Sequence, residues 1–326
     1  MNGLSALWGI AAVLGVPMLS CGYALAVEAL LARLGGRRGA AWRPWLWLAP
    51  AGLLLAGLLV YPVLRTVALS LMDAGGTGYV GFRNYLHVFS DRSLLLVLRN
   101  NLRWLLVFPV AASVAGLAIA VLADRTRYEK VLKSVIFMPA AISLAVAGVL
   151  WRFMYQFQPA GTAQTGSVNA LLCWLDPGFT PRAWLFDPAL NNGALIAGMV
   201  WIQAGYAMVL FSASLKNIPE SLIEAARLEG ANGFQVFFKV VLPLMRSTVV
   251  VVLTTYVVIA LKVFDFVYVT TSGTLGTDVI GNRMYKEMFI YNHYERASTL
   301  AVVMLLAIIP IMILNIRSFR KDGRSP

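Results

Sequence analysis

Two apolar segments of the sequence, residues 193–215 and 247–270, contain an unusual density of polar and aromatic side chains. The first places an indole, an amide and a phenol within two helical turns, at Trp201, Gln203 and Tyr206. The second adds the phenol of Tyr256. Sugars bind through aromatic platforms and bidentate polar hydrogen bonds, so this mixture fits a hydroxyl-rich solute. Lining of a solute pathway and simple packing between helices are both open for these four residues.

Two ionisable residues lie near the end of the second segment. Lys262 and Asp265 are three positions apart, which places them on one face of a continuous helix. An unpaired charge inside a membrane costs at least about 2.5 kcal/mol, so neutralisation of each by the other is favoured. We therefore expect a structural ion pair here, ahead of direct contact with a ligand.

The interval between these segments, residues 216–246, is polar and predicts two short helices with a sharp corner. Pro219 suits a first helical position, and Glu220 then lies in the first turn, where the helix dipole favours an acidic group. Glu224 and Arg227 are spaced for an i,i+3 pair. Gly230 predicts the end of the first helix. A second helix from Phe234 must end or kink near Pro243.

Small side chains on the first of these helices indicate a docking surface. Ala225 and Ala226 interrupt a run of bulkier residues, so another protein can approach the backbone closely there. A short helix of this kind at the membrane surface is suited to binding in a groove of a partner.

The same residues carry a resemblance to a known family. Glu224-Ala225-Ala226, followed by Gly230-Ala231 and by Leu242-Pro243, resembles the cytoplasmic EAA loop of the membrane-spanning subunits of bacterial ABC importers. Glu229 departs from the family's usual Asp but keeps its charge. The resemblance implies that the loop couples the chain to an ATPase through Glu224, Ala225, Ala226, Arg227, Gly230, Ala231 and Pro243.

Further phrases resemble the carbohydrate-uptake (maltose-type) branch of these importers. Lys262-Val263-Phe264-Asp265 is similar to a stretch of that branch, although the usual Gly-Gly-Pro does not follow it. The sequence continues instead as Ser272-Gly273-Thr274-Leu275, which, with Gln158-Pro159-Ala160-Gly161 and Asn169-Ala170, resembles the α-glucoside permease subgroup. This resemblance extends from about residue 45 to the end.

Composition places the chain in a membrane. Of the 326 residues, 59% are hydrophobic and only 13% are charged, about half the share found in soluble domains. No Gly-rich phosphate-binding loop is present, so the sequence predicts no nucleotide site in this chain. The two histidines and two cysteines are scattered, which argues against a metal site, a disulfide or an enzyme embedded in the membrane. We expect no enzymatic activity and no cofactor in this chain.

Basic residues predict how the chain crosses the membrane. Four clusters of four Lys or Arg, sixteen of the 27, flank alternate apolar segments, which is a topology signal and not a nucleic-acid site. They place the C-terminus and the loop 216–246 in the cytoplasm and the N-terminus outside. The four clusters run from Arg33 to Arg43, from Arg125 to Lys133, from Lys216 to Arg246 and from Arg317 to Arg324.

Seven apolar stretches are long enough to span a bilayer. The predicted fold is therefore an all-α polytopic membrane protein with about seven transmembrane helices. Residues 1–44 form an extra, uncleaved N-terminal helix and a basic cytoplasmic loop, and residues 45–326 form the permease domain. Pro139 is expected to kink the fourth span. The spans cover residues 5–31, 45–71, 102–123, 134–154, 193–215, 247–270 and 297–316.

The resemblance also implies partners and a location. The chain would lie in a bacterial inner membrane beside a second permease subunit, with two ATP-binding subunits below that hold ATP and Mg. An extracytoplasmic solute-binding protein would deliver a sugar, and the outer loop from Tyr155 to Asn192 is either its contact or a plain solvated loop. The alternative is a secondary transporter driven by an ion gradient, although such proteins usually show repeated halves, and none is evident here.

Overall fold

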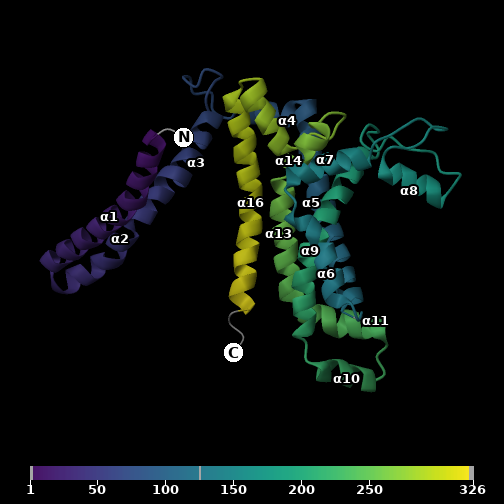
Figure 1. Ribbon diagram of the computed structural model, residues 1–326. Helices are drawn as coiled ribbons and strands as arrows, with labels where there is room; N and C mark the ends of the chain where they lie inside the picture. Colours follow the sequence, from purple (N-terminus) through teal and green to yellow (C-terminus); the bar gives the residue numbers. More distant parts are fainter. Residues whose placement is uncertain (1–2, 125, 323–326) are drawn as a thin grey trace. The chain divides into compact units, whose positions relative to one another are not determined.

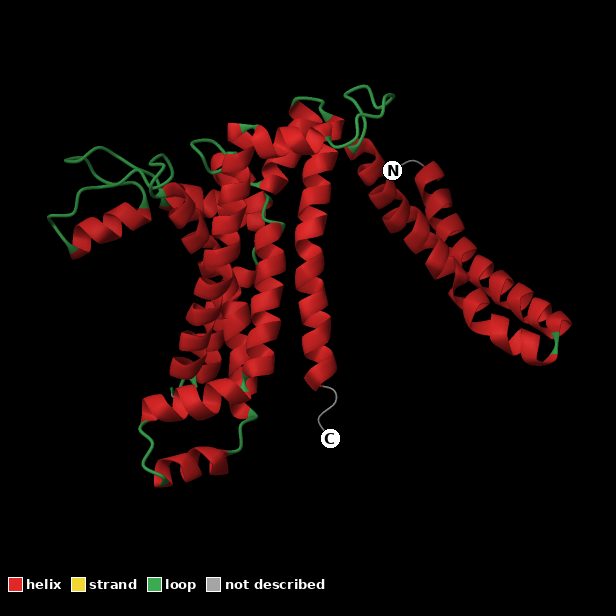
Figure 2. Ribbon diagram, turned by 180° about the vertical axis from the view of Figure 1, so that it is seen from behind, coloured by secondary structure: helices red, strands yellow, loops and turns green. Residues whose placement is uncertain are grey.

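The computed structural model describes residues 3–124 and 126–322, and these residues form helices and loops with one isolated bridge between Met72 and Tyr79 (Figure 2). Two members of the basic clusters, Arg125 and Arg324, lie outside the described residues. By their contacts the chain divides into two compact units, Met1–Arg65 and Thr66–Pro326.

The first unit is a helical hairpin. Helix α1 (Gly3–Leu34) packs against α2 (Gly36–Leu55), and the turn between them uses Gly35 and Gly36 at positive φ. Arg43 and Glu28 join the two helices at 2.8 Å. The chain continues through the π-helical turn η1 (Ala56–Val60) into α3 (Tyr61–Ser70). The domain boundary predicted after residue 44 stays a prediction. Residue 44 lies within α2, which packs against α1.

The second unit begins with the end of α3, a loop and two helices, α4 (Arg83–Ser90) and α5 (Arg92–Ala123). Helix α6 (Glu129–Phe137), the 3-10 turn η2 (Met138–Ala141) and α7 (Leu144–Met154) follow. A long loop then carries the short α8 (Ser167–Leu175), and α9 (Asn191–Lys216) forms the centre of the bundle.

The remaining helices of this unit are shorter, apart from the last. They are α10 (Glu220–Leu228), α11 (Gly233–Val236), the π-helical η3 (Phe237–Val241), α12 (Leu242–Leu244), α13 (Arg246–Leu261), α14 (Asp265–Thr271), α15 (Ile280–Tyr285), η4 (Lys286–Ile290) and α16 (Tyr294–Asp322). Helix α10 lies at one end of the bundle, whereas α4, α14 and α8 lie toward the other (Figure 1).

The core forms where α5, α9 and α13 pack together. Trp104 and Phe108 of α5 and Tyr256 of α13 are fully buried, and the Phe108 and Tyr256 ring centroids are 5.4 Å apart. The helices approach closely because glycines lie in the contact. A methyl group at Gly116 of α5 would overlap Ala207 of α9 and lie 2.9 Å from the Ala204 carbonyl oxygen.

Four helices of the described part are long and apolar enough to cross a membrane, or up to six if each of two bent pairs counts as one span. The four are Gly39–Ser70, Arg92–Ala123, Asn191–Lys216 and Tyr294–Ile313. They agree with four of the predicted spans and confirm the all-α polytopic class. The predicted first span, residues 5–31, falls within helix α1, although most side chains of its first half lie outside the described residues.

Two of the predicted spans are interrupted in the structure. Helix α6 with η2 and helix α7 are bent by 102°, which confirms the expected kink at Pro139. The predicted span 247–270 is wrong as one helix, because α13 ends at Leu261 and α14 begins only at Asp265. The side-chain amide of Asn101 on α5 donates to the Leu261 carbonyl (3.4 Å), so a neighbouring helix satisfies the interrupted backbone.

The close approach of α5 and α9 gives a stability prediction. Replacing Gly116 with alanine should destabilise the purified protein by about 1–3 kcal/mol, because the new methyl group overlaps Ala207. Gly193→Ala on α9 is the matched control, since nothing lies within 4 Å of its added carbon. Thermal unfolding in detergent measures both, and equal midpoints for the two variants would contradict this packing.

Candidate functional site

The loop between α9 and α13 is closed by a complete helix C-cap. Helix α10 ends where Gly230 adopts φ +88°, a conformation that glycine reaches without strain. The Gly230 amide donates to the Arg227 carbonyl, and the Ala231 amide donates to the Ala226 carbonyl, both at 3.0 Å. These two bonds are the Schellman motif. The Gly230-Ala231 pair therefore holds the chain at a fixed angle as it leaves α10.

The next helix begins with an equally complete N-cap. The Asn232 side chain accepts from the Gln235 amide at 2.9 Å, and the Gln235 side chain accepts from the Asn232 amide at 3.0 Å. The helix runs through η3 to Leu244, directly after Pro243, which confirms the predicted end. At Met245, which is buried, the chain bends by 72° into α13. Caps at both ends of the corner make α10–α12 a defined structural element.

Helix α10 divides its side chains between the bundle and the surface. Ile223 and Ala226 pack against the core, whereas Glu224, Ala225 and Arg227 are exposed. Two details differ from the sequence expectation. Pro219 is the N-cap and not the first helical residue, and no ion pair of the described residues joins Glu224 to Arg227. The exposed carboxylate and guanidinium therefore remain available at the surface.

A cluster of ion pairs that the sequence analysis missed lies at the same end of the bundle. The Lys133 ammonium contacts Asp124 at the end of α5, Glu129 at 2.6 Å, and the Ser212 hydroxyl on α9. Lys216 of α9 also contacts Glu129. The i,i+4 spacing of Glu129 and Lys133 was the only local signal for it. The cluster ties the ends of three helices together.

A cavity of about 200 Å³ separates this cluster from α10. Its lining comes from both sides, with Asp124 from the cluster and Arg227 from α10. Leu215 and Ile223 supply part of its apolar wall. The short element α10–α12 therefore lies over the ends of α5 and α9 and does not fill the space beneath it.

Tyr256 is a packing residue in this structure. Its hydroxyl donates to the Gln203 carbonyl (2.6 Å) and accepts from the Ala207 amide (3.0 Å). Residues 203 and 207 are one i→i−4 pair of helix α9, so the hydroxyl meets both polar groups of a single helical turn. The side chain is fully buried. These contacts are those of packing between helices, and a role of Tyr256 in a solute pathway stays a prediction.

Trp201 and Tyr206, by contrast, are partly exposed on α9. Trp201 is 42% exposed and meets Trp151 edge to face, with 5.7 Å between ring centroids. Tyr206 is 36% exposed, and Gln203 is half-buried. These three residues therefore reach the surface of this chain, where a solute or another subunit can contact them.

The expected ion pair between Lys262 and Asp265 does not form. Helix α13 ends at Leu261, so the two residues no longer share one helical face. Both are exposed, and no ion pair of the described residues joins them. Asp265 is instead the first residue of α14, where the helix dipole stabilises its charge.

Asparagines clamp the opposite end of the bundle, another feature that the sequence analysis missed. Asn100 of α5 donates to the carbonyls of Gly276 (2.7 Å) and Asp278 (2.8 Å), and Asn191 of α9 donates to Leu275 (2.8 Å). Asn101 accepts from the Ile280 amide at 2.6 Å. The loop between α14 and α15 is thereby fixed to both central helices.

Asp278 is the charged member of this clamp. Burial raises the pKa of its carboxyl above the ordinary value, while the Asn282 amide and the nearby Lys286 ammonium, 3.6 Å away, act in the opposite direction. The carboxyl is thus held by Asn282 of α15 and Lys286 of η4, which connects the loop to the helices that follow it.

Comparison with known proteins identifies relatives along most of the chain. A family model described as binding-protein-dependent transport system inner membrane component matches residues 112–320. The osmoprotective compounds uptake permease protein GgtC of Synechocystis sp. is 47% identical over 279 residues, 86% of this chain and 99% of that protein. The alpha-glucoside transport system permease protein AglF of Rhizobium meliloti is 44% identical over 282 residues, 86% and 83% respectively.

A solved structure shares the fold. It is a crystal structure of a bacterial alginate ABC transporter in complex with alginate pentasaccharide-bound periplasmic protein. One of its chains matches with a TM-score of 0.71 and 20% sequence identity, covering 87% of this chain and 96% of that one. The likeness shows that the two chains share a fold.

The hydrogen bonds of Tyr256 give a prediction that tests its role in packing the helices together. Tyr256→Phe should lower stability by about 1 kcal/mol, because the hydroxyl no longer meets the Gln203 carbonyl and the Ala207 amide. Tyr206→Phe is the control, since its hydroxyl has no hydrogen bond among the described residues. Thermal unfolding in detergent measures both variants. An equal loss of stability in Tyr206→Phe would contradict this role of the Tyr256 hydrogen bonds.

Proposed function

This chain belongs to the family of binding-protein-dependent transport system inner membrane components, and we propose that it carries a sugar, an α-glucoside or a related oligosaccharide, into the cell. It is the permease subunit of an ABC importer, a class of membrane subunit that is not an enzyme. The observation that carries the substrate class is the 44% identity to the alpha-glucoside permease protein across nearly the whole chain.

The remaining subunits of the importer are inferred from this membership. The chain would form half of a translocation pathway with a second permease subunit, in a bacterial inner membrane. Two ATP-binding subunits would hold ATP and Mg, and an extracytoplasmic binding protein would deliver the sugar. The sequence contains no phosphate-binding loop, which supports nucleotide binding by a partner. The basic tail and the exposed α10 support a cytoplasmic C-terminus.

Coupling would run through α10. Glu224, Ala225 and Arg227 form its exposed surface, and small residues there allow a groove of an ATPase subunit to close around the helix. The Schellman cap at Gly230-Ala231 and the bend after Pro243 connect that surface rigidly to α13. Movement of α10 by the ATPase would therefore tilt α13 and bias the bundle between two arrangements.

The pathway would be lined by exposed residues of α9 and of the break after α13. Trp201, Gln203 and Tyr206 offer aromatic faces and an amide to sugar hydroxyls. Lys262 and Asp265 flank the break, where both side chains are exposed. Tyr256 supports this surface from behind by holding α9. The N-terminal segment 1–44 would be an addition to the permease domain 45–326.

Uptake measurements test the function directly. Membrane vesicles that contain the chain with its importer partners should accumulate radiolabelled maltose, trehalose or sucrose when ATP and the binding protein are supplied. Dissipating the proton gradient should leave this uptake unchanged, because hydrolysis supplies the energy. Uptake that required the gradient and ignored ATP would identify a secondary transporter and overturn the proposal.

The coupling surface gives a more specific prediction. Glu224→Lys should reduce sugar uptake per ATP hydrolysed at least tenfold, since it reverses the charge of the exposed surface without touching the helix caps. The complex should still assemble. Glu229→Lys, at the C-cap of the same helix and on another side of it, reverses the same charge and is the matched control, which should retain most of its coupling. Normal uptake by Glu224→Lys would exclude this surface as the ATPase contact.

A further inference from the structure

A second pocket has a volume of about 520 Å³. Two segments more than 80 residues apart in sequence line it, and the helices that carry them, α7 and α14, lie toward the end of the bundle away from α10 (Figure 1). One comprises the end of α7 and the outer loop, with Arg152, Gln156, Gln158 and Thr165, and the other is the stretch from Thr270 to Leu275. Both contain phrases that the sequence analysis singled out and that neither the coupling surface nor the pathway uses.

The outer-loop wall of this pocket is preorganised by one buried asparagine. The Asn169 amide donates to the carbonyls of Gln156 (3.2 Å) and Arg182 (3.0 Å), and its oxygen accepts from the Arg182 amide and the Trp184 indole. Gly166 fits directly against the Gln156 backbone, where any side chain would overlap it. The position of Gln156 is therefore fixed before a ligand arrives.

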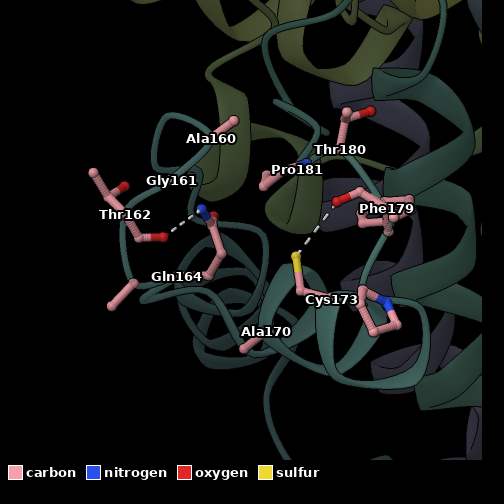
Figure 3. A pocket seen from close by; sticks show the side chains of 12 residues that line it. Ala160, Gly161, Thr162, Gln164, Ala170, Cys173, Phe179, Thr180 and Pro181 are labelled. Carbon is pink, nitrogen blue, oxygen red and sulfur yellow. Dashed lines mark hydrogen bonds between the residues drawn. The ribbon is translucent and has the colours of Figure 1, made fainter.

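A glutamine fixes the neighbouring part of the same wall. Gln164 accepts from the Gln158 amide at 3.1 Å and donates to the Gln158 carbonyl at 2.9 Å. Figure 3 shows Gln164 also reaching the Thr162 carbonyl, on the side of the loop that lines a different pocket. The backbone of Gln158 is thus held from within the loop, which leaves its side chain for the pocket.

The opposite wall is held by the asparagine clamp. Asn191 binds the Leu275 carbonyl, and the Thr271 and Thr277 hydroxyls lie 2.7 Å apart. Ser272 and Thr274 line the pocket from this clamped loop, and their hydroxyls donate to the Tyr268 and Thr271 carbonyls. Both walls are therefore built from loops whose backbones are tied down, as ligand sites that are largely preformed require.

The lining has the chemistry of a site for a neutral, hydroxyl-rich ligand. Its polar groups are two side-chain amides, several hydroxyls and one guanidinium, that of Arg152, and none of the lining residues is acidic. Phe157 and Phe186, which are 39% and 69% exposed, add two aromatic faces. Without a carboxylate it has no ligand set for a divalent cation. One basic side chain, that of Arg152, is also too few for binding a polyphosphate.

We propose that this outer pocket is an entry subsite that binds one end of a short neutral oligosaccharide before it passes to the α9 surface. Gln156, Gln158 and Thr165 donate and accept hydrogen bonds with sugar hydroxyls, and Phe186 covers a ring face. The inference rests on the proposed function and adds a specificity site to it. Solute selection is then shared by two places in this chain, the outer pocket and the pathway.

Direct binding to the assembled importer tests the subsite. The complete complex in nanodiscs, without nucleotide or binding protein, is titrated with maltose, trehalose and sucrose by saturation-transfer difference NMR. The double variant Gln156→Ala/Thr165→Val should raise the Kd of the best ligand at least fivefold, because two hydrogen-bonding groups are lost. Thr162→Val, three residues from Thr165 but in the lining of the other pocket, should bind as the unmodified protein does.

A second variant keeps the test decisive if the double variant unfolds. Phe186→Ser changes an exposed side chain that the fold does not need, and should raise the Kd about threefold through loss of the ring face. Unchanged Kd values in both variants would overturn the subsite. So would normal saccharide binding combined with a loss of ATPase stimulation by the binding protein, since the pocket would then be a protein contact.

Uptake measured in parallel separates this inference from the proposed function. If the unmodified importer takes up sugar with ATP and the pocket variants bind and transport normally, only the subsite is wrong. If the unmodified importer transports none of the three sugars, the proposed function fails and the subsite fails with it.

Discussion

Every interruption of a helix in this bundle exposes backbone groups that an apolar environment cannot hydrate. The structure meets this constraint with side chains from neighbouring helices. Asn101 of α5 donates to the Leu261 carbonyl where α13 ends. The Tyr256 hydroxyl of α13 also bonds to one turn of the uninterrupted helix α9. Gly116 allows the close approach of α5 and α9. The positions of the breaks, and hence of the polar surfaces beside them, follow from this set of contacts.

The same constraint gives the two ends of the bundle different characters. At the α10 end the helix termini are satisfied locally, by the Schellman bonds at Gly230-Ala231 and by the capping box of Asn232 and Gln235. At the other end the loop after α14 is satisfied by asparagines from α5 and α9. A locally capped element can move as one body, whereas a loop bonded to two long helices moves with them. This difference suits a lever at the first end and a fixed pocket wall at the second.

Features that depend on nearby residues were predictable from the sequence. Gly230, Pro139 and Pro243 each interrupt a helix through their own backbone chemistry, and the structure confirms all three. The break at residues 262–264 was not predictable, because it depends on Asn101, 160 positions earlier along the chain. A continuous apolar run gives no sign that a distant amide will donate to a carbonyl at its end. The Lys262–Asp265 pair was wrong for the same reason, since its geometry assumed an unbroken helix.

The candidate solute residues illustrate how burial sorts chemically similar side chains. Tyr206 and Tyr256 have identical hydroxyls and ring centroids 6.3 Å apart. Tyr206 reaches the surface, whereas the buried hydroxyl of Tyr256 both donates to and accepts from the backbone of α9. The Tyr256 hydroxyl is fully buried against α9, so it is not open to a sugar hydroxyl. In the proposed function, solute contact in this region would therefore fall to the exposed face of α9, with Tyr256 holding that face in position.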